Sequence, residues 1–165
     1  MAKDTEELLE LVYVIDGDRA PRTRRVASDS ILKDVLEAVA QEHQREDLLA
    51  LYREDEELAM ALKLAVIEVL AGEFQVFHLG RREKVAVEVT YNGRTVHERF
   101  SPSTTVRKVI AWAISPQALN LQGDVSDFQL KHNGDLLPPE LHVGQLAHHH
   151  EAVRLTLVFK VKPQG

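Results

Sequence analysis

The chain has 165 residues and contains no cysteine, so disulfides, thiolate zinc sites and cysteine nucleophiles are excluded. Its sequence also has no apolar run of the roughly 18 residues that a membrane span requires. The acidic N-terminal segment lacks the basic and then apolar order of a secretory signal. The phosphate-binding loops GxxxxGK[ST] and GxGxxG and the hydrolase motif GxSxG are missing too. We therefore expect a cytoplasmic protein with no membrane partner and none of these enzyme activities.

Acidic and basic residues are divided unevenly along the chain. Residues 1–80 contain 9 Lys and Arg against 18 Asp and Glu, a net charge of −9, whereas residues 81–165 contain 11 against 8, a net charge of +3. Such a division indicates two units with different surfaces. Only 5% of the residues are aromatic, and no basic stripe is interleaved with them. We therefore expect no nucleic-acid partner.

Residues 81–165 carry the clearest secondary-structure signals. The alternating run KVAVEVTY, the pair Asn92-Gly93 and the run RTVHERF predict a hairpin, because a type I′ turn favours Asn-Gly. Apolar residues then recur at helical spacing after Thr104 and Thr105, either of which suits an N-cap. The expected elements are strands at 84–91 and 94–100, a helix at 105–115 and a last strand at 152–161. Between the helix and the last strand, a strand from 127 turns tightly at Asn133-Gly134 into a short strand that ends at 137.

The first half repeats this order. The expected elements are strands at 11–15 and 22–27, a helix capped by Ser30, a third strand at 48–53 and a last strand at 74–79. The segment 56–70 is rich in helix formers, so propensity predicts a helix there, ended by Gly72, with no counterpart in the second half. Core packing is favoured over a partner-binding role for its apolar residues Leu58, Leu62, Ala65, Val66 and Val69.

The duplicated order predicts an α+β protein with two tandem domains. In each half a hairpin, a crossing helix and further strands form two layers. We expect one domain at 9–80 and another at 83–161, followed by a tail at 162–165. Only the short segment GRREK, residues 80–84, separates the two domains, so little free linker exists.

These features resemble the ubiquitin-like β-grasp family. The resemblance rests on the order of elements, on helices that open at SDSI (28–31) and STTV (103–106), and on the strand and tail LTLVFKVKPQG (155–165). Two fused domains of this kind are similar to the two-domain, interferon-induced type of modifier and to the BilA-type modifiers of bacterial antiphage operons. The resemblance covers about residues 9–165 and implies two tandem ubiquitin-like β-grasp domains.

The resemblance also implies a function without catalysis, cofactor or metal. Family members are activated at the C-terminal carboxylate by an E1-like enzyme, passed to a cysteine of an E2-like enzyme, joined to a target protein and released by a JAB-type protease. Here the carboxylate would belong to Gly165, whose lack of a Cβ suits a narrow channel. Lys160 and Lys162 match the basic tail positions, and Val158 matches part of the hydrophobic recognition patch. The target would be a phage protein if the role is antiphage defence.

Some residues depart from the family pattern. The family usually ends in Gly-Gly, but this chain ends in Pro163-Gln164-Gly165, and Lys131 stands where an apolar patch residue is usual. Proline stiffens the tail, and lysine in place of arginine loses bidentate recognition. The conjugating enzymes should therefore be dedicated partners. The alternative hypothesis is a non-covalent β-grasp interaction scaffold. A precursor with residues beyond Gly165 would need trimming before activation.

Three further features allow a plain and a sharper interpretation. The run at His148–His150 fits a solvated loop better than a metal site, since no fixed set of ligands accompanies it. Trp112 lies off the apolar helix face, so it either flanks the core, contacts the first domain or anchors a partner, and we include it among the partner-binding candidates. The arginines at 22, 24 and 25 fit a solvated strand edge better than a site for an acidic partner.

Overall fold

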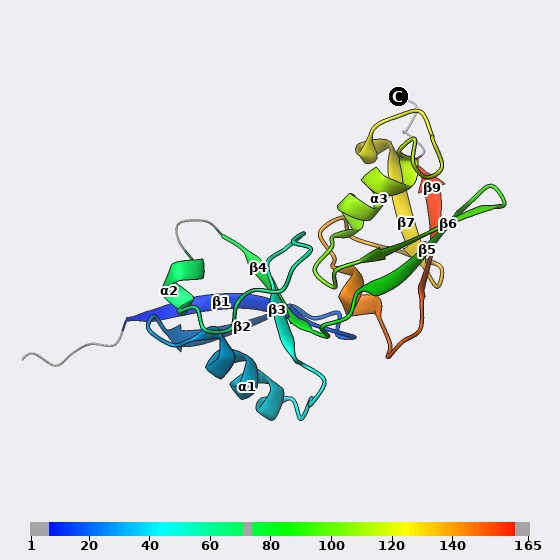
Figure 1. Ribbon diagram of the computed structural model, residues 1–165. Coiled ribbons are helices and arrows are strands. Elements are labelled where there is room, and N and C mark those ends of the chain that lie inside the picture. The colour runs from blue at the N-terminus through cyan, green and yellow to red at the C-terminus, as the bar shows by residue number, and fades with distance from the viewer. Residues whose placement is uncertain (1–6, 71–73, 161–165) are drawn as a thin grey trace, which may run out of the picture.

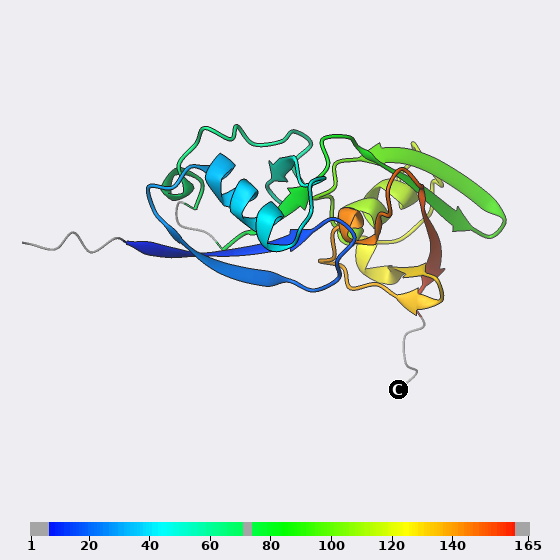
Figure 2. The same cartoon turned by 90° about the horizontal axis from the view of Figure 1, so that it is seen from below.

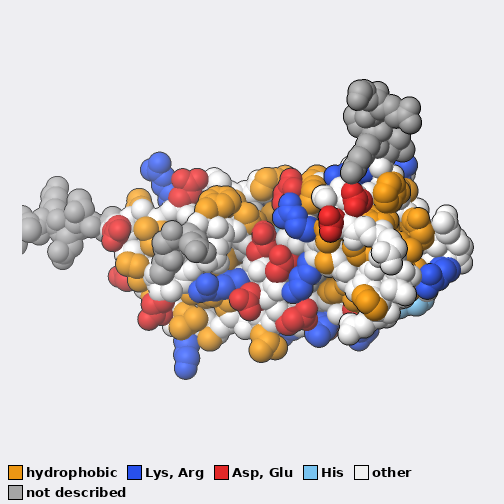
Figure 3. Space-filling view, turned by 90° about the horizontal axis from the view of Figure 1, so that it is seen from above, with side chains coloured by type: hydrophobic (Ala, Val, Ile, Leu, Met, Phe, Trp, Pro, Cys, Tyr) orange, Lys and Arg blue, Asp and Glu red, His pale blue; other side chains and the backbone are white. Residues whose placement is uncertain are grey.

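A computed structural model describes residues 7–70 and 74–160. It contains a four-stranded and a five-stranded sheet, built from residues 8–80 and 85–159 respectively, which lie one after the other along the molecule (Figure 1, Figure 2). A helix crosses one face of each sheet. The visible face in Figure 3 intersperses acidic and basic side chains, so no patch of a single sign dominates that face.

The first sheet has the strand order β2-β1-β4-β3. Its strands are β1 (Leu8–Ile15), β2 (Arg22–Ala27), β3 (Ala50–Tyr52) and β4 (Val76–Gly80). Strand β1 pairs with β2 in antiparallel and with β4 in parallel orientation, while β3 pairs antiparallel with β4. Helix α1 (Leu32–Glu42) packs on this sheet because its apolar residues recur on one face. The core residues include Leu11, Tyr13, Leu32, Val35, Leu36, Val39, Phe77 and Leu79.

The second sheet has the order β6-β5-β9-β7-β8. Its strands are β5 (Val85–Tyr91), β6 (Arg94–Phe100), β7 (Phe128–His132), β8 (Asp135–Leu136) and β9 (Val153–Phe159). Strand β5 pairs antiparallel with β6 and parallel with β9, as β1 does with β2 and β4. Helix α3 (Val106–Ile114) covers the inner face, and a 3-10 turn, η1 (Val125–Asp127), precedes β7. Both halves therefore have one topology, the β-grasp, and the predicted α+β fold class is confirmed.

Both helices begin against the chain that follows the third strand. The N–H groups of Leu32 and Lys33 donate to the carbonyls of Leu64 and Leu62, each at 2.9 Å. In the second half Val106 and Arg107 donate in the same way to Leu141 and Pro139. These bonds satisfy helix N–H groups that have no partner within the helix.

The N-cap of α3 is as predicted, whereas that of α1 is not. The Thr105 side chain accepts the Lys108 N–H at 3.2 Å. The N-cap of α1 is Ile31, which makes no side-chain capping bond, so the assignment of Ser30 was wrong. The tertiary bonds from the loop replace the side-chain cap.

The predicted helix at 56–70 is also wrong. Only α2 (Val66–Val69) is helical, and Leu58 is 81% exposed, although Val66 and Val69 are buried. The backbone before α2 bonds to other elements instead of forming helical hydrogen bonds. For example, the Met60 N–H donates to the Leu51 carbonyl of β3 at 2.8 Å. Tertiary hydrogen bonds thus override helix propensity. The second half has a counterpart, the 3-10 turn η2 (Val143–Leu146), so the two halves differ less than the sequence indicates.

Two alanine substitutions distinguish the observed loop from a buried helix. We expect Val66→Ala to lower the free energy of unfolding by about 2 kcal/mol, because it empties a fully enclosed site. Leu58→Ala should change it by less than about 0.5 kcal/mol, because that side chain is solvated. Urea denaturation of both variants measures the difference, and equal losses would contradict the loop.

Candidate functional site

The C-terminal end of β9 is held firmly in the second sheet. Phe159 pairs with Phe128 of β7, and their rings meet edge-on with centroids 5.2 Å apart. Beyond the strand, the Lys160 N–H donates to the Asp127 carbonyl at 2.7 Å. The end of β9 points away from the first domain (Figure 1). Hydrogen bonds therefore hold Phe159 and Lys160 in the second domain, at its end away from the first domain.

The residues predicted for partner binding lie on different faces. Val158 and Lys160 are half-buried at the end of β9, where Val158 alternates with the core residue Leu157 and so faces outward. Trp112 packs edge-on against Phe100 of its own domain, with centroids 5.4 Å apart. Trp112 thus flanks the core from the helix side, and the structure does not bring it together with Val158. The predicted Lys162 and Gly165 lie outside the described residues.

The outer face of the second sheet is polar. Glu88 on β5 forms an ion pair with the Arg154 guanidinium at 3.3 Å and lies 3.5 Å from the His97 ring. The half-exposed Lys131 on β7 lies beside Thr156 of β9. This face has the charged composition of a solvated surface.

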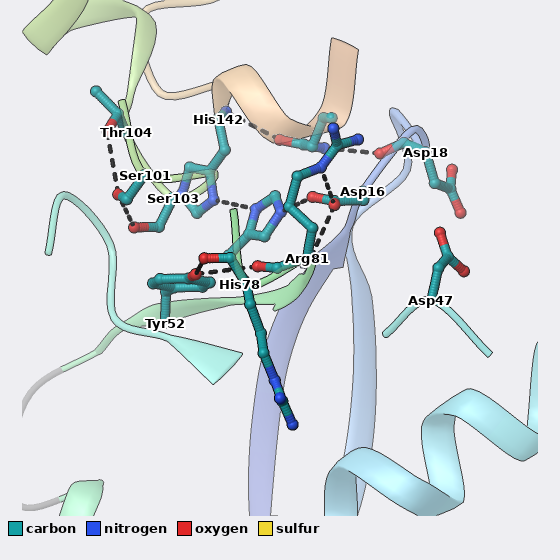
Figure 4. Close-up of polar contacts among 12 residues, drawn as sticks. Asp16, Asp18, Asp47, Tyr52, His78, Arg81, Ser101, Ser103, Thr104 and His142 are labelled. Atoms are coloured by element: carbon teal, nitrogen blue, oxygen red, sulfur yellow. Dashed lines mark hydrogen bonds and ion pairs between the residues drawn. The ribbon is translucent and has the colours of Figure 1, made fainter. Parts of the chain in front are cut away.

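One end of the equivalent face of the first sheet is covered. Val14, Tyr52 and His78 point away from α1 and lie outside the hydrophobic core, yet each is at most 4% exposed. Residues 101–105 and the η2 segment of the second domain lie at this end of the sheet (Figure 4). We call this contact the junction.

A chain of polar side chains crosses the junction (Figure 4). The Asp16 carboxylate lies 2.6 Å from Nε2 of His78, whose Nδ1 lies 3.1 Å from Nδ1 of His142 in the second domain. Nε2 of His142 in turn lies 2.9 Å from the Glu54 carboxylate of the first domain. The Arg81 backbone and guanidinium both donate to Asp16 at 2.9 Å.

This chain is buried and its hydrogen bonds are satisfied. Within residues 7–70 and 74–160, every buried side-chain nitrogen or oxygen has a partner. Burial alone would raise the pKa of Asp16, but the hydrogen bonds from His78 and Arg81 outweigh burial and hold that pKa below its usual value. Asp16 is therefore an ionised carboxylate inside the junction.

A glycine permits the close contact between the domains. A Cβ on Gly144 would lie 2.5 Å from the His78 ring and 2.7 Å from the Asp16 carboxylate. The Gly144 carbonyl accepts the N–H of Gly17 at 2.9 Å, where Gly17 has a φ of +75°. Any side chain at position 144 would push the two domains apart.

The first domain also caps a helix of the second. The Asp55 carboxylate accepts from the N–H of Thr105 at 2.7 Å and from its hydroxyl at 3.0 Å. The Lys108 ammonium donates to the Asp55 carbonyl at 2.9 Å. The first turn of α3 contains no acidic residue, so Asp55 supplies the negative charge that favours a helix N-terminus.

Further bonds surround these contacts. The Gln145 amide donates to the carbonyls of Asp18 and Arg19 at 3.1 and 3.2 Å. The Arg81 guanidinium also donates to the His149 carbonyl. Apart from this bond, His148–His150 form an exposed loop, and no group of metal-ligating side chains occurs among the described residues.

Sequence reasoning missed the residues of the junction. None of its main residues was selected from the sequence, and these are Asp16, Glu54, Asp55, His78 and His142. One signal was present: His78 interrupts the apolar strand FQVFHL, and His142 lies in the apolar loop LHVGQL. Their pairing across 64 residues of chain was not readable from spacing.

Two substitutions of Asp55 test the cap across the junction. Asp55 has a φ of +62°, which Asn tolerates and Ala does not. We expect Asp55→Asn to lower the free energy of unfolding by about 0.5–1 kcal/mol through the lost charge. Asp55→Ala should lower it by about 2 kcal/mol, because it also removes the cap and strains the backbone.

Hydrogen exchange localises this effect. Both variants should exchange the amides of Thr105 and of the first turn of α3 faster than the wild type. Asp29→Ala, at an exposed loop position, serves as the control. Unchanged exchange in Asp55→Ala would contradict the cap.

Comparison with known proteins supports the fold. Residues 86–160 match the family model described as BilA ubiquitin-like domain 2. None of the curated proteins matches the chain significantly. No helix in the described part of the chain is long and apolar enough to cross a membrane.

Solved structures with similarity to the chain include ubiquitin of Caldiarchaeum subterraneum. It is 13% identical, with a TM-score of 0.39 over 49% of this chain and 99% of that one. A protein designed on human erythrocytic ubiquitin is 23% identical, with a TM-score of 0.36 over 50% of this chain and 96% of its own. A structure titled "Molecular Mimicry of SUMO promotes DNA repair" is 13% identical, with a TM-score of 0.39 over 47% and 92% of the two chains. Residues 86–160 are thus similar to the second ubiquitin-like domain of BilA, and the two halves of the chain are two tandem β-grasp domains.

Proposed function

We propose that the chain is a ubiquitin-like modifier of other proteins, with domains at 9–80 and 83–161 and a conjugation tail at 162–165. An E1-like enzyme would use ATP to adenylate the Gly165 carboxylate. An E2-like enzyme would then carry it as a thioester, and a lysine amine of the target would displace the thiol to form an isopeptide bond. A JAB-type protease would reverse the attachment, and a phage protein would be the target in antiphage defence.

The position of the β9 end is the observation that supports this proposal best. Strand pairing holds the chain up to Lys160, and this end points away from the first domain (Figure 1). An enzyme can therefore approach the tail without displacing the first domain. The chain has no cysteine, so the thiols of the thioester steps would belong to the partner enzymes.

Individual residues receive roles under this proposal. Lys160 and Lys162 would contact acidic residues of the activating enzyme. Val158 would contribute to recognition on the outer sheet face, and Trp112 would anchor a partner on the helix face. Lys131, which pairs with Thr156 on the same sheet face as Val158, makes this surface more polar than in most family members, so the enzymes would be specific for this modifier.

Reconstitution tests the proposal. The chain is incubated with ATP and with the E1-like and E2-like proteins encoded beside it. We expect ATP-dependent adducts larger by one copy of the chain, abolished by deletion of Gly165 and retained in Asp29→Ala as the matched control. Peptide mass spectrometry should find the Gly165 carbonyl on a lysine amine.

The opposite outcome favours the scaffold. Adducts that persist without Gly165, or no adduct together with full biological activity of a chain lacking Pro163–Gly165, would overturn conjugation. Binding without covalent attachment would then be the function of the fold.

A further inference from the structure

Two buried histidines meet at the junction, one from each domain. His78 is 0% exposed and His142 is 1% exposed. Their ring centroids are 5.3 Å apart with an interplanar angle of 31°, and the two Nδ1 atoms are 3.1 Å apart (Figure 4). Two nitrogens at this distance form a hydrogen bond only if one of them carries a proton and the other does not.

The number of protons that the hydrogen bonds require defines the protonation state of the His78–His142 pair. The outer nitrogens face the carboxylates of Asp16 and Glu54, and an ionised carboxylate only accepts, so both Nε2 atoms must carry a proton. One Nδ1 must carry a third proton to bond the other. Two neutral rings hold only two protons, and two imidazolium rings hold four. Three bonds therefore require one neutral ring and one imidazolium.

The surrounding charges match this count. The charged groups facing the pair are the carboxylates of Asp16 after β1 and Glu54 after β3, and the Arg81 guanidinium after β4, which contacts Asp16. In the part of the second domain that the structure describes, the buried polar groups near the pair are uncharged: Ser101, Ser103, Thr104 and Gln145. Two negative charges and one positive charge are neutralised by one imidazolium.

We propose that the junction closes around one bound proton, so that docking of the two domains is strongest when the His78–His142 pair carries a single positive charge. Loss of that proton at higher pH breaks one of the three bonds. Gain of a further proton in acid places two N–H groups against each other between the domains. The pair then acts as a pH-sensitive latch, independent of whether the chain is conjugated.

The environment of each ring assigns the positive charge. Burial lowers the pKa of His78, although the bond to Asp16 and its charge partly oppose this effect. His78 therefore stays neutral with its proton on Nε2, and the count of bonds leaves the third proton on Nδ1 of His142. Glu54 is 38% exposed, so it can turn to water if its bond to His142 breaks.

The two sides of the pH profile differ in strength. The pKa of His78 is lower in the folded protein than its unfolded value of about 6.5. The contribution of His78 to docking is therefore complete above that unfolded pKa, and it is lost as the pH falls through the folded pKa. Asp16, whose pKa is also depressed, extends this loss to still lower pH. At higher pH only the Glu54 bond is lost, so weakening there is milder.

Histidine side-chain NMR tests the latch. In the full chain labelled with 15N, the Nδ1 and Nε2 shifts are followed from pH 5 to 9, together with the tumbling times of the two domains from amide relaxation. We expect His78 as the neutral Nε2–H tautomer and His142 doubly protonated at the pH where the domains tumble as one body. Glu54→Gln removes the carboxylate that faces His142, so it should move the upper side of the docking profile to lower pH by about one unit.

Control variants distinguish the pH-sensitive latch from a purely structural role of Glu54. Glu56→Gln, whose side chain is exposed, should leave both sides of the profile unchanged. Glu54 lies on a surface loop, so its variant folds. Two neutral histidines throughout the docked range, or an identical profile in Glu54→Gln and wild type, would overturn the proposal.

Discussion

The close approach of Gly144 to the first sheet is the contact on which the rest of the molecule depends. Because position 144 has no Cβ, the η2 backbone reaches the Asp16 carboxylate and the His78 ring. That approach brings His142 within 3.1 Å of His78 and lets Gly17 bond the Gly144 carbonyl. Without this approach, Nδ1 of His78 would lose its partner in the second domain, and this end of the sheet would face water.

The junction makes the two similar domains differ in which surfaces are buried. In the first, one end of the outer sheet face is buried by docking, and Asp55 stabilises a helix of its neighbour. In the second, the equivalent face is polar and open, and β9 ends at the far pole. The two domains share one topology, but the outer faces of their sheets differ in exposure and in polar contacts.

Much of this fold was predictable from the sequence, because local signals decide it. Asn92-Gly93 and the alternating strands on either side gave the hairpin, and the spacing of Val106 and Ile110 gave α3. The helix at 56–70 failed because backbone bonds to Leu51 and α1 outweigh propensity. The junction was not readable, since Asp16, His78 and His142 come together only after both domains have folded.

The central claim is that the two domains form one rigid body joined at the junction. Residual dipolar couplings of the strand amides, recorded in a single weakly aligned sample at neutral pH, test it directly. The account predicts that one alignment tensor fits β1 and β4 together with β5 and β9 in the observed relative orientation. Two tensors of different magnitude, one for each domain, would contradict it.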